Sequence, residues 1–282
     1  MAPTLPSNPT LHLTPEPLTP ESFAPFGTAI VSPLPRHLSA APADLSSLPP
    51  HHPSPELANQ SSALKYSPVS PLLDQYAGAC PSGRAASARM SMFCCFPRQL
   101  RTIESARHGT KTQSQSQSPK TPVFDVRILE RHPFTTQTFI PIDLSSQPST
   151  RSSAEGPLWR ANEGKEEEEP YYLVIVAPTL KGQTVTATTD SGSTTIRDPP
   201  DLQNLRAFVA RGGQAVTYGA GTWHAPMVVV GKRRVDFVVA QFVNGVGDED
   251  CQEAAFGEGV VVELGRDAVL GSLRGGVVKA KL

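Results

Sequence analysis

Short apolar runs recur along the chain and alternate with stretches that are rich in proline, serine and charge. The runs are rich in Val, Ile, Phe and Tyr, which is typical of strands. They cover residues 28–31, 89–96, 123–129, 137–142, 171–177, 183–187, 214–218, 226–230 and 234–243. So many short strands predict an all-β fold, either a barrel or a sandwich, and we expect the barrel.

Two segments have helix signals instead. Residues 19–21, Thr-Pro-Glu, offer an N-cap, a proline at the first helical position and an early acid, and Gly27 is the expected stop. Asp201 is the expected N-cap of a second segment, whose apolar residues share one helical face before Gly212 and Gly213. We therefore expect a few short helices beside the strands.

Four low-complexity stretches interrupt the pattern, at residues 33–55, 105–120, 145–170 and 188–200. They lack an apolar period, so they cannot bury enough apolar surface to offset the entropy of ordering them. We expect long disordered insertions within a single domain at residues 18–250. A flexible N-terminus at 1–17 and a C-terminal extension at 251–282 would flank that domain.

The charge is nearly balanced, with 25 Lys and Arg against 26 Asp and Glu, which argues against nucleic acid or an anionic membrane as partner. The apolar run at 171–178 is too short to cross a bilayer, and the first residues lack a signal-peptide pattern. None of the four cysteines is spaced as C-x-x-C, which favours free thiols in a reducing compartment: Cys80, Cys94, Cys95 and Cys251. An intracellular protein acting on a small molecule fits these properties.

The last three residues, Ala280, Lys281 and Leu282, resemble the S-K-L peroxisomal address. We therefore expect import into peroxisomes, with a cytoplasmic location as the alternative.

Residues 213–224 place a strand, a glycine-rich turn and then His224 at the start of the next strand. Glycines let the backbone turn tightly at the mouth of a barrel, so that the next inward side chain enters the cavity. A histidine there can bind a metal or move a proton. The second motif of cupin barrels has this layout, although Gly219 stands where that motif has proline.

Glu130 and His132 are spaced by two and share one strand face, while Arg131 points away and Gln137 follows after four residues. This spacing resembles the first cupin motif with altered chemistry. Together with His224, it predicts four inward polar groups around one cavity. In the alternative interpretation, Glu130 and His132 close a surface hairpin and His224 is a hydrogen-bonded core residue.

The chain resembles the ureidoglycolate lyase family over about residues 18–250. The resemblance lies in the order and spacing of several strings: Glu130-Arg-His-Pro, Gln137-Thr-Phe-Ile-Pro, Pro200-Asp-Leu, Leu205-Arg-Ala-Phe, Tyr218, Trp223-His and Asp236-Phe. Residues 18–27 and 59–66 are also similar, and fungal-type members carry a lysine where Lys65 stands. One departure is Ala225, where members commonly have a second histidine.

The resemblance implies a cupin-like jelly-roll enzyme, a carbon–nitrogen lyase that cleaves (S)-ureidoglycolate to glyoxylate and urea in allantoin and purine catabolism. It implies catalytic roles for Glu130, His132, His224 and Lys65, and substrate-binding roles for Gln137, Tyr218, Asn59 and Arg98. Glu130, His132, Gln137 and His224 would bind a divalent metal (nickel, manganese or zinc), or the histidines would act directly as acid and base. The resemblance also implies a homodimer, and we expect no organic cofactor.

Two alternatives stay open from the sequence. A hydrolase would release ammonia and carbon dioxide with the glyoxylate. A non-catalytic cupin-fold binding or regulatory protein would fit the insertions and Ala225.

Overall fold

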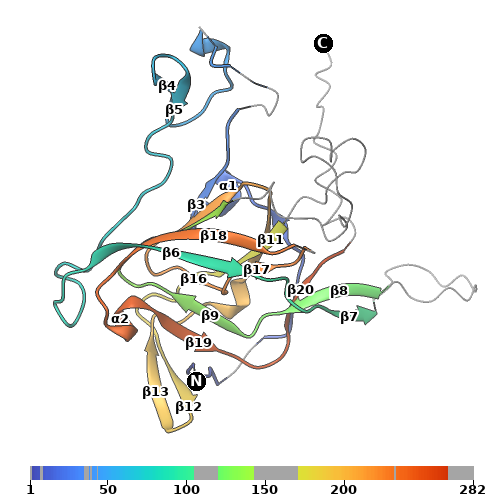
Figure 1. Cartoon of the computed structure of the whole chain (residues 1–282). Coiled ribbons are helices and arrows are strands. Elements are labelled where there is room, and N and C mark those ends of the chain that lie inside the picture. Colours follow the sequence, from blue (N-terminus) through green and yellow to red (C-terminus); the bar gives the residue numbers. More distant parts are fainter. Residues whose placement is uncertain are drawn as a thin grey trace, which may run out of the picture.

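The computed structural model describes residues 2–6, 9–34, 38, 40–42, 44–104, 120–142, 171–231 and 233–265. The predicted insertion at 145–170, all but the last residue of the one at 105–120, and the C-terminal tripeptide lie outside the described residues. Strands dominate the described part of the chain, so the predicted all-β fold class is confirmed (Figure 1).

Three larger sheets carry most of the strands. One has the order β3 (Gly27–Ile30), β15 (Ala215–Tyr218), β10 (Gln137–Ile142), β18 (Val235–Val243) and β6 (Ser87–Cys95). The second, here called the central sheet, has the order β19 (Gln252–Ala255), β9 (Ile128–Arg131), β16 (Trp223–His224), β11 (Tyr171–Ala177), β14 (Arg206–Arg211) and β2 (Glu16–Pro17), with β17 (Val228–Val229) also on β11. The third has the order β1 (Leu11–Leu13), β20 (Val260–Glu263), β8 (Lys120–Asp125) and β7 (Arg101–Glu104).

The remaining elements are short. Two hairpins form, β12 (Thr184–Thr189) with β13 (Gly192–Arg197), and β4 (Glu56–Ala58) with β5 (Ala63–Lys65). The helices are α1 (Pro20–Phe23), α2 (Gly247–Asp250) and the single 3-10 turns η1 (Leu45–Ser47) and η2 (Leu202–Asn204). No helix in the described ranges is both long and apolar enough to span a membrane.

The central sheet is buried on both faces, which explains why β11 is an unbroken apolar run. Tyr172, Val174 and Val176 belong to an inner core, which they share with residues of β10, β15 and β18. Their neighbours in the sequence, such as Leu173 and Ile175, belong to an outer core shared with β20 and the β12–β13 hairpin. Two apolar layers therefore flank the central sheet and fix which way each of its side chains points.

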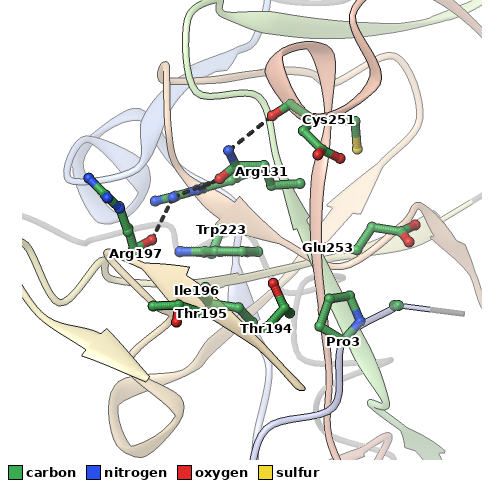
Figure 2. Close-up of a pocket in the computed structure, with 12 residues that line it drawn as sticks. Pro3, Arg131, Thr194, Thr195, Ile196, Arg197, Trp223, Cys251 and Glu253 are labelled. Carbon is green, nitrogen blue, oxygen red and sulfur yellow. Dashed lines mark hydrogen bonds between the residues drawn. The ribbon is translucent and has the colours of Figure 1, made fainter. Parts of the chain in front are cut away.

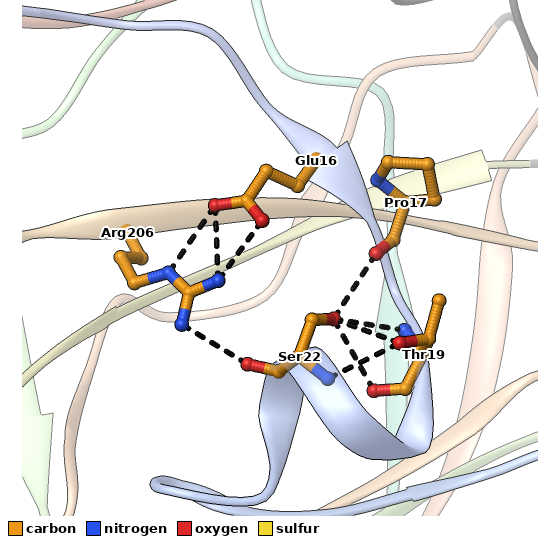
Figure 3. Close-up of polar contacts among 5 residues, drawn as sticks. All are labelled: Glu16, Pro17, Thr19, Ser22 and Arg206. Atoms are coloured by element: carbon orange, nitrogen blue, oxygen red, sulfur yellow. Dashed lines mark hydrogen bonds and ion pairs between the residues drawn. The ribbon is translucent and has the colours of Figure 1, made fainter.

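The helix signal at residues 19–21 is confirmed. The Ser22 amide donates to Thr19 Oγ1 at 3.1 Å, and the Thr19 amide donates to the Ser22 hydroxyl oxygen at 3.3 Å, which completes a capping box (Figure 3). Arg206 of β14 donates to the Ser22 carbonyl at 3.1 Å and to both Glu16 carboxylate oxygens, and so ties the helix to the central sheet.

The second predicted helix is wrong. Asp201 does cap the Gln203 amide at 3.1 Å, but only the short turn η2 follows before the chain enters β14. Residues of β14 pair with β11 along six positions and bury their side chains against both apolar layers. Burial in the central sheet thus overrides the helical periodicity of this segment.

The predicted loop insertion at 188–200 is also wrong, because most of it lies in the β12–β13 hairpin, whose Ile196 is buried in the outer core. The terminal boundaries need a similar correction. Strands β1 and β2 lie within the expected flexible N-terminus and pair with β20 and β14, and β19 of the expected C-terminal extension pairs with β9. Both ends of the described chain therefore belong to the sheets.

Candidate active site

Three ionisable side chains converge where β9 meets β16. Glu130 lies in β9, and His132 is the first residue after this strand. His224 of β16 pairs with Glu130 across the sheet. One ligand atom from each of the three lies within 4.8 Å of the others, and His224 Nε2 is 3.5 Å from Glu130 Oε1. The structure thus places the two predicted motifs at one site.

The facing sheet contributes two more predicted residues. Gln137, at the start of β10, places Oε1 3.2 Å from His224 Nε2, and its amide nitrogen donates to Gln241 Oε1 at 2.6 Å. Tyr218, which pairs with Gln137 in the register of β10 and β15, stacks on the His224 ring at 3.8 Å between centroids. The site therefore lies between the ends of strands from two sheets.

The turn before His224 works as its glycines predict. Gly221 has φ +76°, a conformation that side chains other than glycine rarely adopt, and its amide donates to the His132 carbonyl at 2.8 Å. The turn thereby connects the backbones on which the two histidines stand.

Backbone carbonyls orient both histidines. His132 Nδ1 lies 2.6 Å from the Asp250 carbonyl oxygen, and His224 Nδ1 lies 2.9 Å from the Thr222 carbonyl oxygen. Because a carbonyl only accepts, each Nδ1 must carry the proton and donate it. Each Nε2 is then left for a ligand or a proton, an arrangement that is typical of metal-binding histidines.

Two buried polar atoms of the site have no hydrogen-bond partner among the described residues, His132 Nε2 and the Tyr218 hydroxyl. Leaving such a group unpaired costs about 1–3 kcal/mol, so a pair of them in one place indicates a missing ligand. Two imidazole nitrogens, a carboxylate and the Gln137 carbonyl oxygen form a donor set that suits nickel, manganese or zinc. The residues present therefore fit a divalent metal.

The electrostatics favour the protonation states that such a site needs. Burial alone would raise the pKa of Glu130, but its hydrogen bond to His224 and the nearby imidazoles outweigh burial and lower it. Burial, together with the neighbouring His224, lowers the pKa of His132. Burial also holds the pKa of Tyr218 well above its usual range. Glu130 is therefore a carboxylate at neutral pH, His132 a neutral imidazole and Tyr218 a neutral phenol.

A cavity of about 430 Å³ reaches Glu130 from the surface. Arg98 lines the same cavity, together with Phe93 and Cys95 from β6 and Met227. The Arg98 amide donates to the Val229 carbonyl at 2.8 Å, which fixes its backbone beside β17. This predicted carboxylate binder thus shares an accessible cavity with the acid of the site.

Asn59 and Lys65 are not brought to the site within this chain. Both are exposed, Lys65 at the end of β5 and Asn59 in the turn before it, and this hairpin projects away from the larger sheets (Figure 1). Asn59, Gln60 and Ser61 all have positive φ, so Asn59 starts a tight turn and does not lie on a strand facing the cavity.

Sequence reasoning missed several supporting residues. The Asp250 and Thr222 anchors act through backbone carbonyls, which every residue has, so no sequence signal could reveal them. Gln241 holds Gln137 from the neighbouring strand β18, a contact that depends on the strand register. Arg131 was expected to point away from the site; it does so, but it is buried on the opposite face of the sheet.

An all-β fold with a carboxylate, two histidines and a glutamine between facing strand ends is similar to a cupin-type enzyme centre. The chain belongs to the ureidoglycolate lyase family, because the family model of that description matches residues 10–263. The matched range begins one residue before β1 and ends at the last residue of β20, so it includes the terminal strands.

Individual relatives agree with this membership. A ureidoglycolate lyase of Schizosaccharomyces pombe is 30% identical over 235 residues, which cover 83% of this chain and 86% of the relative. A ureidoglycolate lyase of Saccharomyces cerevisiae is 31% identical over 208 residues, which cover 72% of this chain and 80% of the relative. A ureidoglycolate lyase of Burkholderia mallei is 31% identical over 121 residues, which cover 43% of this chain and 45% of the relative.

Proposed function

We propose that this protein is a ureidoglycolate lyase that cleaves (S)-ureidoglycolate into glyoxylate and urea. The observation that carries the proposal is the convergence of Glu130, His132 and His224 within 4.8 Å, in a chain of the ureidoglycolate lyase family.

The chemistry of the substrate explains why these groups suit the reaction. Ureidoglycolate is a carbinolamine with a carboxylate, so cleavage removes the hydroxyl proton, forms the aldehyde C=O and breaks the bond to the urea nitrogen, which takes up a proton. Glu130 is ionised and can accept the hydroxyl proton, and the neutral Tyr218 hydroxyl can donate a hydrogen bond to the reacting centre. The two Nε2 atoms face the same small volume.

A divalent metal has a natural place in this scheme. Glu130, His132, His224 and Gln137 would hold it, and it would supply Lewis acidity towards the substrate hydroxyl. In the metal-free alternative, Glu130 and the histidines act directly as base and acid. In both cases Arg98 would hold the substrate carboxylate with charge-assisted hydrogen bonds from the wall of the cavity.

Ala225 gives little support to the non-catalytic alternative. Its side chain is buried in the outer core, on the face of the central sheet away from His224. A histidine at this position on this backbone would face away from the site, so its absence leaves the cluster of Glu130, His132 and His224 complete.

The deciding experiment incubates the purified protein with racemic ureidoglycolate and follows urea, ammonia and glyoxylate together. A lyase yields urea and glyoxylate in equal amounts from half of the racemate. Ammonia in place of urea would favour the hydrolase, and no turnover would favour the binding or regulatory protein.

Three further assignments belong to this proposal: a place in allantoin and purine breakdown, a homodimer and peroxisomal import. Strand β6 supports the homodimer, because it is a nine-residue edge strand that exposes Met90 and Met92. Light scattering after size exclusion would measure twice the chain mass. A fluorescent fusion should enter peroxisomes and lose this location when residues 280–282 are deleted.

A further inference from the structure

Arg131 lies between Glu130 and His132 in the sequence, but on the opposite face of the central sheet. Its guanidinium carbon lies 4.6 Å from the centroid of the Trp223 ring, and Trp223 immediately precedes His224 (Figure 2). Both side chains are buried, with Arg131 at 7% exposure and Trp223 at 0%. A cation stacked on an indole therefore joins the two strands that carry the candidate catalytic groups.

The guanidinium is held by neutral acceptors. Its Nε and Nη2 donate to Gln252 Oε1 at 3.0 and 2.8 Å, Nη1 donates to the Asp198 carbonyl at 2.9 Å, and Nη2 donates to the Arg197 carbonyl at 2.7 Å. The Trp223 indole N–H donates to the same Asp198 carbonyl at 2.9 Å. One carbonyl at the end of the β12–β13 hairpin thus fixes both members of the stack.

Asp198 is itself fixed in an unusual conformation. Its φ is +49°, and its carboxylate accepts a hydrogen bond from the Gly182 amide at 2.6 Å. Non-glycine residues are uncommon in this conformation, although Asp adopts it more often than most, and the Gly182 hydrogen bond helps to hold Asp198 there. The end of the hairpin is therefore held through the Asp198 side chain, while the Asp198 carbonyl binds both members of the stacked pair.

Within the central sheet, β16 is held to β11 by two registered pairs, but its direct pairing with β9, the strand that carries Glu130, is short. Strand β16 has only two residues, and it meets β9 at one registered pair, Glu130 with His224. With so short a ladder, small rotations of either strand would move the side chains that face the inner core. Contacts on the outer face can prevent those rotations, because alternate residues of one strand turn together.

We propose that the Arg131–Trp223 stack, anchored by Asp198 and Gln252, is a positioning device that sets the separation of Glu130, His132 and His224. This inference rests on the proposed function for its kinetic test, but not for its spectroscopic test. Arg131 lies on the face of the sheet away from the candidate site, so it acts through the two strands.

A second stack in the same protein provides a matched control. The Arg206 guanidinium carbon lies 4.8 Å from the Phe208 ring centroid, and its nitrogens bind Glu16 and the Ser22 carbonyl (Figure 3). This pair also lies on the central sheet, on β14, and its ring contacts among the described residues are with Phe23 and Phe26, not with the candidate site. Loss of either arginine should destabilise the fold, whereas only loss of Arg131 should disturb the site.

Variants Arg131→Ala, Arg131→Lys and Arg206→Ala are compared in the full-length protein. We expect Arg131→Ala to lower kcat about 100-fold with little change in KM, since a misplacement of about 1 Å costs that much. The kcat of Arg131→Lys should also stay low, because lysine keeps the charge but lacks the planar guanidinium group. Arg206→Ala should keep the wild-type kcat even if its Tm falls as much as that of Arg131→Ala.

Chemical rescue sharpens the kinetic test. A cavity of about 620 Å³ borders Arg131 and Trp223 on the outer face, so a free guanidinium ion can reach the vacated position (Figure 2). Millimolar guanidinium should raise the kcat of Arg131→Ala at least tenfold, and sodium chloride at equal ionic strength should not. An Arg131→Ala enzyme with wild-type kcat, or one that guanidinium leaves unchanged, would overturn the proposal.

A milder pair of variants covers the case in which Arg131→Ala does not fold. Gln252→Ala removes the acceptor of two Arg131 hydrogen bonds, whereas Gln252→Glu keeps an acceptor there. We expect about a tenfold loss of kcat for the first, because one to two net hydrogen bonds are lost, and near wild-type kcat for the second. Equal kcat values for the two variants would contradict the proposal.

The imidazole nitrogen resonances of His132 and His224 test the positioning without substrate or metal. They should shift in Arg131→Ala or Gln252→Ala and stay unchanged in Arg206→Ala. Unchanged spectra in all variants would refute the positioning role. If the wild-type protein turns over no ureidoglycolate but the spectra respond as expected, the proposed function fails and the positioning device stands.

Discussion

The Tyr218 hydroxyl allows a prediction in which stability and activity move in opposite directions. The ring is 1% exposed and stacked on His224, and the hydroxyl has no partner among the described residues. Tyr218→Phe removes only that oxygen and keeps the stack. Because a buried unpaired group costs about 1–3 kcal/mol, the free protein should gain about 1 kcal/mol, a rise in Tm of about 2–4 °C.

The same change should slow the reaction. If the hydroxyl donates to the reacting centre, its removal costs one preorganised donor, which is typically about 100-fold in kcat. Tyr172→Phe is the matched control, since its hydroxyl donates to the Gln214 carbonyl at 2.5 Å away from the site. That variant should lose about 1 kcal/mol of stability and keep its kcat.

Differential scanning fluorimetry and steady-state kinetics measure both effects on the same samples. A Tyr218→Phe protein that is less stable than the wild type and equally active would refute the reasoning. That result would mean that the hydroxyl has a structural role in the free protein and none in the reaction.

Three further predictions concern the cavity, the metal and acid stability. Arg98→Ala should raise KM about 10- to 100-fold at nearly constant kcat, because a charge-assisted hydrogen bond is worth about 1.5–3 kcal/mol; Arg89→Ala, on β6 but outside the cavity lining, should leave KM unchanged. Exhaustive chelation should abolish turnover and nickel, manganese or zinc should restore it, whereas full activity of metal-free protein confirmed by mass spectrometry would remove the metal from the scheme. Hydrogen bonds from Ser82 and Asn244 outweigh burial and hold the pKa of Glu249 below its usual range. The stability that this carboxylate contributes is therefore present above its unfolded pKa and is lost as pH falls through the folded pKa. Glu249→Gln should therefore lower Tm near neutral pH and flatten the fall of Tm on acidification, and parallel Tm–pH curves for the two proteins would contradict this.

Several strands of the larger sheets could be predicted because they are apolar enough to stand out, whereas short or more polar strands such as β1, β4 and β19 lie outside the predicted runs. The β11 run is buried at every position, and its sequence contains only Tyr, Leu, Val, Ile and Ala. Of the β12–β13 hairpin, only the first strand is predicted, at residues 183–187, because β13 is rich in threonine and serine and mostly exposed. Strand β14 was mistaken for a helix because both of its faces are apolar, which blurs the difference between periods of 2 and 3.6.

The candidate site shows the same division. Glu130, His132 and His224 could be predicted because strand alternation and a glycine turn are local properties that the sequence displays. The hydrogen-bond partner of His132 could not be predicted, since the Asp250 carbonyl lies 118 residues away along the chain, and the Thr222 carbonyl that binds His224 is a backbone group with no sequence signal. The role expected for Lys65 comes from the family resemblance alone, because no local sequence signal shows the direction in which the short β4–β5 hairpin projects.

The most direct test of the central claim compares the wild-type protein with Glu130→Gln on racemic ureidoglycolate, with urea and glyoxylate measured in the same reaction. Glu130→Gln keeps the shape of the side chain and removes the carboxylate next to His224. The account predicts equal release of urea and glyoxylate by the wild type and a loss of at least 100-fold in the variant. Equal rates for the two proteins would contradict the assignment of the active site.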